Sequence, residues 1–108
     1  MKRYDVLLDT DAEDDLFDIY RYVALNDSIV QADRLFEGIR KACYSLRTSL
    51  LRGNVPLELH DIGVSEFREI RFKPYRIMYS IKRRTVIVHC ILDAHRDIQT
   101  LLQERLLR

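Results

Sequence analysis

The clearest pattern in the chain is a period of two in residues 75–82. Hydrophobic positions there alternate with mostly polar ones: Tyr75, Ile77, Tyr79 and Ile81 against Arg76, Met78, Ser80 and Lys82. Such alternation is typical of a β-strand. Residues 67–72 predict a preceding strand, because Ile70 and Phe72 fall on one face and charged side chains fall on the other. Pro74 cannot donate a ladder hydrogen bond, so we expect the turn between the two strands there.

Two more strands are predicted on either side of this pair. Residues 85–92 follow a tight basic turn at Arg83 and Arg84 and are apolar on both faces, which favours a central position in a sheet. Near the N-terminus, residues 3–9 form a short apolar run that predicts a first strand. Its apolar face consists of Tyr4, Val6 and Leu8.

Two amphipathic helices are predicted between the first strand and the later ones, because apolar residues recur there at three- and four-residue spacing. One stripe contains Leu16, Ile19, Tyr20, Val23 and Ala24, and the other contains Ala32, Leu35, Phe36, Ile39, Ala42, Cys43 and Leu46. Thr10 with Glu13, and Ser28 with Gln31, have the spacing of capping boxes at helix starts. The short connection between the helices predicts an antiparallel hairpin.

Residues 48–66 contain Gly and Pro at irregular positions and predict a loop, which we expect Leu57 and Leu59 to pin to the rest of the fold. Asp93 is a candidate cap for a last helix. The apolar stripe of that helix consists of Ile98, Leu101, Leu102 and Leu106. The chain therefore predicts one α+β domain over residues 1–108, with the order β-α-α-β-β-β-α. We expect a small antiparallel sheet with an N-terminal helical hairpin, all helices on one face and the other face open.

Charge is uneven along the chain although the net charge is only +1. Residues 1–30 carry three basic and eight acidic residues, whereas residues 66–108 carry ten basic and five acidic ones. This asymmetry favours an acidic partner for the C-terminal half, the alternative being a solvated surface with accidental clustering.

Cysteine and histidine positions do not indicate a metal site or a cofactor. Cys43 and Cys90 are far apart and each lies among apolar neighbours, so we expect both to be buried and reduced. His60, His89 and His95 lack metal-site spacing, and His89 is expected to be a packed histidine inside a strand. No apolar run reaches the length of a membrane span, and the N-terminus does not read as a signal peptide, which predicts a cytoplasmic protein.

Three segments of the chain resemble the RelE/ParE superfamily of bacterial toxins. They are DLFDIYRYVA at 15–24, EIRF at 69–72 with YRIMY at 75–79, and ILDAHRDIQTLL at 91–102. RelE-like members are ribosome-dependent mRNA endonucleases, whereas ParE-like members poison DNA gyrase. The resemblance implies a cognate antitoxin protein and a hetero-oligomer with it.

The C-terminal segment favours the ParE branch. Arg71 and Arg96 match two arginines of the RelE pattern, but Leu102 stands where RelE-type motifs carry a tyrosine. The stretch from Asp93 to Asp97 is similar to the HGRRD-like ending of ParE-like members, although it lacks the glycine and one arginine. A net charge of +1 also favours a protein target over polyanionic RNA.

The leading prediction is therefore a ParE-like toxin that inhibits DNA gyrase by protein–protein contact. The predicted target-binding residues are Arg71, Arg76, Lys82, Arg83, Arg84 and Arg96. The predicted antitoxin-binding residues are Ile98, Leu101, Leu102 and Leu106. The alternative is an mRNA endonuclease whose catalytic residues would be Arg71, His95 and Arg96. A third possibility is a non-toxic binding module.

Overall fold

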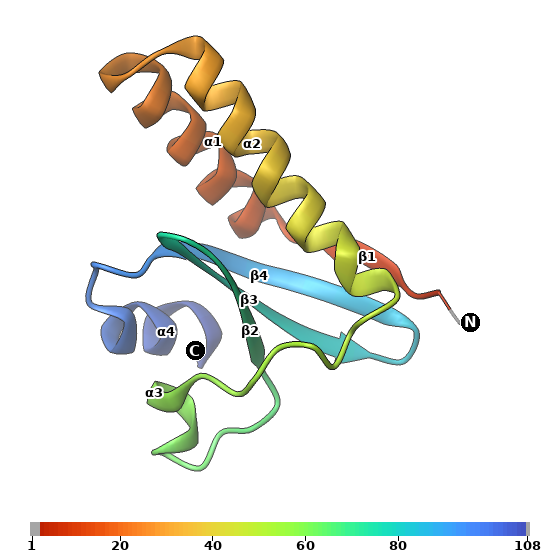
Figure 1. Ribbon diagram of the computed structural model, residues 1–108. Helices are drawn as coiled ribbons and strands as arrows, with labels where there is room; N and C mark the ends of the chain where they lie inside the picture. The colour runs from red at the N-terminus through yellow and green to blue at the C-terminus, as the bar shows by residue number, and fades with distance from the viewer. Residues whose placement is uncertain (1–2, 108) are drawn as a thin grey trace.

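The computed structural model describes residues 3–107 and contains a four-stranded sheet. Helices lie on both sides of this sheet (Figure 1). The elements are β1 (Asp5–Leu8), α1 (Thr10–Asn26), α2 (Ile29–Tyr44), the 3-10 turn η1 (Ser45–Arg47), α3 (Leu57–His60), β2 (Arg68–Phe72), β3 (Tyr75–Lys82), β4 (Thr85–Asp93) and α4 (Ile98–Leu106). The α+β class and the β-α-α-β-β-β-α order are confirmed. Met1 and Lys2, which belong to the N-terminal stretch considered for a signal peptide, lie outside the described residues.

The strands lie in the order β1-β4-β3-β2, so β4 is central as its apolar sequence predicted. β2, β3 and β4 form an antiparallel meander, and β1 adds a parallel pairing with β4 in which Val6 lies opposite Val86. A strand's own alternation does not specify its neighbour, so the parallel edge was not visible in the sequence.

Both faces of the sheet are covered, and the expectation of an open face is wrong. The α1–α2 hairpin covers one face, and α3 and α4 lie on the other (Figure 1). The first core includes Leu16, Ile39 and Ile77, whereas the second includes Met78 and Leu102. Because β4 is apolar on both faces, each face requires a partner layer.

Two of the three predicted helix caps are wrong, and in both cases another aspartate caps the helix. Asp9, not Thr10, caps α1 by accepting a hydrogen bond from the Ala12 amide at 2.9 Å. Ser28 caps α2 as predicted, through the Gln31 amide. Asp97, not Asp93, caps α4. Asp93 still belongs to β4, and its carboxylate accepts from His95 instead.

The segment before β2 is pinned to the sheet by a tyrosine as well as by a leucine. Leu59 is buried as expected, but Leu57 is 68% exposed. The Tyr79 hydroxyl donates to the Leu50 carbonyl and accepts from the Gly53 amide. A Cβ at Gly53 would collide with the Glu69 carbonyl and the Tyr79 hydroxyl, so the close approach of this loop to β2 requires glycine.

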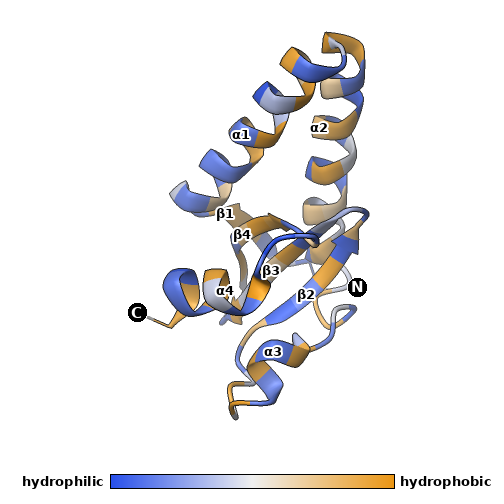
Figure 2. Cartoon of the chain, turned by 90° about the vertical axis from the view of Figure 1, so that its left-hand side faces the viewer, coloured by the Kyte–Doolittle hydropathy of each residue, from blue (hydrophilic) through white to orange (hydrophobic). Residues whose placement is uncertain are grey.

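The far end of the helical hairpin extends away from the sheet (Figure 1). Hydrophobic residues continue to this end (Figure 2). Leu25 at the end of α1 and Ile29 and Val30 at the start of α2 are all more than half exposed. The lower half of the hairpin therefore builds the core, while its upper end presents apolar surface.

Candidate target-binding surface

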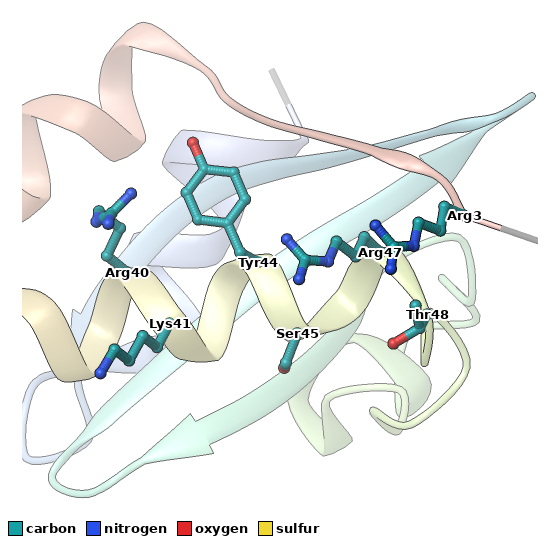
Figure 3. Close-up of a pocket in the computed structure, with 7 residues that line it drawn as sticks. All are labelled: Arg3, Arg40, Lys41, Tyr44, Ser45, Arg47 and Thr48. Atoms are coloured by element: carbon teal, nitrogen blue, oxygen red, sulfur yellow. The ribbon is translucent and has the colours of Figure 1, made fainter.

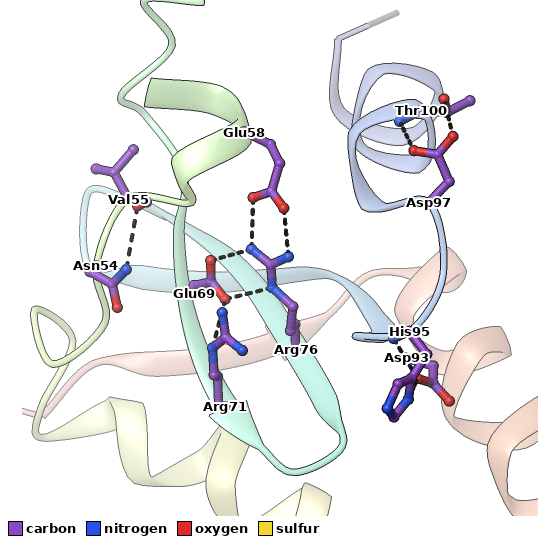
Figure 4. Close-up of polar contacts among 10 residues, drawn as sticks. All are labelled: Asn54, Val55, Glu58, Glu69, Arg71, Arg76, Asp93, His95, Asp97 and Thr100. Carbon is purple, nitrogen blue, oxygen red and sulfur yellow. Dashed lines mark hydrogen bonds and ion pairs between the residues drawn. The ribbon is translucent and has the colours of Figure 1, made fainter. Parts of the chain in front are cut away.

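Arg76 is the most enclosed of the predicted target-binding residues. It is 5% exposed and donates to both oxygens of Glu58 on α3 and both oxygens of Glu69 on β2, at 2.6–2.8 Å (Figure 4). These hydrogen bonds lower the pKa of the Glu58 carboxyl and raise the pKa of Arg76 itself. Arg76 therefore joins α3 to the sheet, and this conformation does not present it to a target.

Arg71 and Arg96, the two arginines of the nuclease alternative, lie on different faces of the sheet. Arg71 is on the α3 side and contacts Glu69 at 3.5 Å (Figure 4). Arg96 lies on the hairpin side, where it lines a hollow of about 270 Å³ together with Asp15, Asp18 and other residues. The structure does not bring these two cations together.

His95 is held by its neighbour Asp93. One Asp93 oxygen lies 2.8 Å from both the His95 amide and the His95 Nδ1, while the His95 side chain is 83% exposed (Figure 4). The amide hydrogen bond lowers the pKa of the Asp93 carboxyl. This geometry orients the ring at the β4–α4 connection.

The β3–β4 turn presents three consecutive cations, Lys82, Arg83 and Arg84, all exposed. Arg83 adopts a φ of 59°, in the left-handed region, at the tip of the turn. Lys82 and Arg83 line a hollow of about 460 Å³ that also includes Leu7 and Ile87 from the neighbouring strands. We call Lys82, Arg83, Arg84, Leu7 and Ile87 the turn patch.

A second basic surface lies at the end of α2 and was missed in the sequence. It is a hollow of about 680 Å³ (Figure 3). Its lining consists of Arg3, Arg40, Lys41, Tyr44, Ser45, Arg47 and Thr48, which we call the α2 hollow. Arg40 and Lys41 lie on α2 and Arg47 lies on η1. Arg3 precedes β1 and reaches them because the Tyr4 amide donates to the Arg47 carbonyl. That tertiary contact left no sequence signal, although the spacing of Arg40, Tyr44 and Arg47 suits one helix face.

The turn patch and the α2 hollow are adjacent. The Arg84 guanidinium stacks over the Tyr4 ring at 5.3 Å and donates to the Arg3 carbonyl at 3.2 Å. The Asp5 amide in turn donates to the Arg84 carbonyl. Seven exposed cations thus gather at one end of the molecule, which contrasts with the net charge of +1 for the whole chain.

The predicted antitoxin-binding stripe packs inside the chain. Ile98 and Leu102 are buried against the sheet, and Leu101 and Leu106 are partly buried beside them. Arg105 adds two hydrogen bonds to Asp15 on α1, although burial keeps the Asp15 pKa raised. In this conformation the stripe is part of the core, so a partner could reach all of it only if α4 left the sheet.

The remaining candidates for chemistry have structural roles. Cys43 and Cys90 are buried free thiols, and burial raises each pKa to about 12. His89 places Nε2 2.7 Å from the Ser80 hydroxyl and Nδ1 3.3 Å from the Asp9 carboxylate. Within residues 3–107, no cluster of three metal-ligating side chains was found. In the same part of the chain, every helix is too short or too polar to cross a membrane.

Comparison with known protein families identifies the family of this chain. Residues 6–98 match the family described as the ParE toxin of the type II toxin–antitoxin system parDE. This chain belongs to the ParE toxin family. No match was found among curated protein sequences. The ParE match ends at Ile98, the first residue of α4, so the role of α4 rests on its own contacts.

Solved structures agree with the ParE fold. One similar structure is the chromosomal ParDE toxin–antitoxin system from P. aeruginosa, with a TM-score of 0.71 and 15% identity over 84% of this chain and 96% of that chain. Another is the RelBE2 toxin–antitoxin complex from Mycobacterium tuberculosis, with a TM-score of 0.63 and 21% identity over 86% of this chain and 93% of that chain. Both likenesses concern the fold.

Proposed function

We propose that this ParE-family toxin inhibits DNA gyrase by protein–protein contact through the turn patch, and that a cognate antitoxin neutralises it. The observation that carries the choice of gyrase over RNA cleavage is the separation of Arg71 and Arg96 on opposite sides of the sheet. A nuclease must direct its cations and its proton-transfer groups at one scissile phosphate. Leu102, at the position of the RelE tyrosine, is fully buried.

The turn patch suits a protein target. It combines the exposed cations of the β3–β4 turn with apolar side chains, since Leu7 is 57% exposed and lines the same hollow as Lys82 and Arg83. Protein interfaces combine charge complementarity, which steers association, with apolar anchors that carry binding energy. Arg71 and Arg96 are secondary candidates, whereas Arg76 is engaged with Glu58 and Glu69.

The test is a supercoiling assay with purified protein, gyrase, ATP and relaxed plasmid. The proposal predicts loss of supercoiled product and accumulation of linear DNA when the reaction is stopped with detergent. Normal supercoiling at a tenfold or greater excess of the protein would exclude gyrase as the target.

The mRNA endonuclease alternative rests on the exposed position of His95 next to Arg96. It predicts cuts in messages, mapped by primer extension, that disappear in His95→Ala.

The antitoxin requires an apolar surface that is open in the folded toxin. Such a surface lies beside the edge strand β1, in a hollow of about 340 Å³ lined mainly by apolar side chains, among them Leu7, Phe17 and Phe36. Phe17 is 64% exposed, and the free edge of β1 leaves backbone groups available for pairing. We propose this hollow as the primary antitoxin contact, and the α4 stripe as one that requires α4 to move.

Phe17→Glu tests this assignment. The substitution places a charge on an apolar docking surface without disturbing the core, so the affinity for the antitoxin should fall at least tenfold by calorimetric titration while the melting temperature changes little. Asp18→Lys, at an exposed neighbouring position on α1, is the control and should bind normally. Equal affinities of Phe17→Glu and the original protein would exclude this surface.

A further inference from the structure

The α2 hollow differs in chemistry from the turn patch beside it. All seven of its lining residues are charged or carry a hydroxyl group, and among the described residues that line it there is no acidic and no aliphatic side chain. Within residues 3–107, Arg3, Lys41 and Arg47 form no ion pair, while Arg40 contacts Glu37 at 3.4 Å. Three of the four cations of the hollow are therefore not neutralised by the described part of the chain.

This lining offers a protein partner no aliphatic side chain. The centre of a protein–protein interface normally contains aromatic or aliphatic anchors that become desolvated on binding. The one aromatic side chain in the hollow, Tyr44, lies under the Arg40 guanidinium at 5.6 Å. Within this hollow an acidic protein segment would meet cations but no aliphatic anchor, because the apolar side chains next to Arg40 and Tyr44 belong to the neighbouring hollow beside β1.

The same lining suits a row of phosphates. Contacts to a nucleic-acid backbone come mainly from Arg and Lys and from Ser, Thr and Tyr hydroxyl groups, and this is the composition of the hollow. One guanidinium group can donate hydrogen bonds to two oxygens of a phosphate at once. The hollow contains three such groups, from Arg3, Arg40 and Arg47. Single strands are usually bound by stacking bases on open aromatic rings. The hollow has one ring, Tyr44, and the Arg40 guanidinium lies over it, so a duplex backbone fits better than a single strand.

We propose that the α2 hollow binds the sugar–phosphate backbone of duplex DNA. The inference rests on the proposed function for the source of that duplex, which would be the DNA segment that gyrase holds. Arg84, in the turn patch, donates to the backbone of Arg3 in the hollow, so the two surfaces are joined. The toxin would then contact gyrase with the turn patch and the neighbouring DNA with the α2 hollow, which would favour retention of the cleaved complex.

The test is a titration of the full-length protein into a fluorescently labelled DNA duplex of about 20 base pairs, without gyrase. Because gyrase is absent, the result stands whether or not gyrase is the target. Non-specific duplex binding predicts a Kd of about 1–100 µM near physiological salt. About four phosphate contacts predict a slope of log K against log salt near −4. No binding at about 50 mM salt would overturn the proposal.

Two variants locate the binding. Lys41→Glu combined with Arg47→Glu should weaken duplex binding at least tenfold and flatten the salt slope. Lys41→Gln combined with Arg47→Gln should have a smaller effect in the same direction. The matched control, Arg21→Glu with Arg34→Glu, makes the same change in net charge at exposed positions of α1 and α2 outside the hollow, and should bind within about twofold of the original. Equal losses in the hollow variant and the control would mean that only net charge matters and would overturn the site.

Two competitors decide the kind of ligand. An RNA single strand of equal length that binds ten times more tightly than the duplex would overturn the choice of duplex DNA. Poly-glutamate that displaces the duplex at equal charge concentration would assign the hollow to an acidic protein segment instead. Thermal melting of each variant, monitored by circular dichroism, establishes that it is folded before its binding is compared.

Discussion

At the scale of single residues, one buried arginine determines how α3 meets the sheet. Arg76 forms paired hydrogen bonds with Glu58 and Glu69, and the Glu69 side chain is 2% exposed. The sequence showed the alternation that places Arg76 and Glu69 on one face. It did not show that Glu58, from a segment predicted as a loop, completes the group. Because Glu58 comes from a distant segment, the sequence alone predicts Arg76 as a target contact.

Removing Arg76 should destabilise the protein strongly. Arg76→Met leaves two carboxylates without their cation, one of them buried, so the free energy of unfolding should fall by about 3 kcal/mol in urea. Arg71→Met is the control, because the Arg71 side chain is 57% exposed, and it should change stability by less than about 1 kcal/mol. A loss of similar size in both variants would contradict the structural role of Arg76.

The same group predicts a dependence of stability on acid. Hydrogen bonds from Arg76 lower the folded pKa of Glu58 below its ordinary value of 4.5. The contribution of Glu58 is therefore fully present above that ordinary value and is lost as the pH falls through the lower, folded pKa. Urea midpoints of the original protein and Glu58→Gln should differ most at neutral pH and converge in acid. A gap that stays constant down to pH 3 would contradict the ion pair.

At the scale of elements, α4 completes the second core of the sheet. Its stripe was recognised in the sequence, but the same stripe fits either internal packing or a docking surface. The covered face of β3 and β4 decides in favour of internal packing, because Met78 and Cys90 belong to the same buried cluster as Leu102. The first strand, the helical hairpin and the meander could likewise be predicted from periodicity. The parallel neighbour of β1 and the helix α3 could not, because both depend on distant partners.

Truncation of α4 should unfold the free protein. Deleting residues 99–108 removes Leu102 from the second core and Arg105 from Asp15, so the shortened chain should lose its cooperative thermal transition. Leu102→Ala is the milder form and should cost about 2–5 kcal/mol, whereas Leu107→Ala, at a 38% exposed position, should cost less than about 1 kcal/mol. A folded, stable truncated chain would show that α4 is an appendage.

At the scale of the whole molecule, positive charge is concentrated at one end. Cations from the N-terminal strand, the end of α2 and the β3–β4 turn meet at one end, while the hairpin carries exposed apolar residues at the other, including Leu25 and Ile29. The sequence indicated a basic C-terminal half, which correctly included Lys82, Arg83 and Arg84. It missed Arg3 and Arg47 because their approach depends on a backbone hydrogen bond between segments far apart in the chain.

The most direct test of the account compares gyrase inhibition by the original protein with inhibition by Arg83→Glu combined with Arg84→Glu. The turn variant should require at least tenfold more protein to halve supercoiling, because it replaces two of the three cations of the turn patch with acidic residues. Arg21→Glu with Arg34→Glu should inhibit as the original protein does. Undiminished inhibition by the turn variant would show that the toxin meets gyrase through another surface. Absence of inhibition by the original protein would reject gyrase as the target.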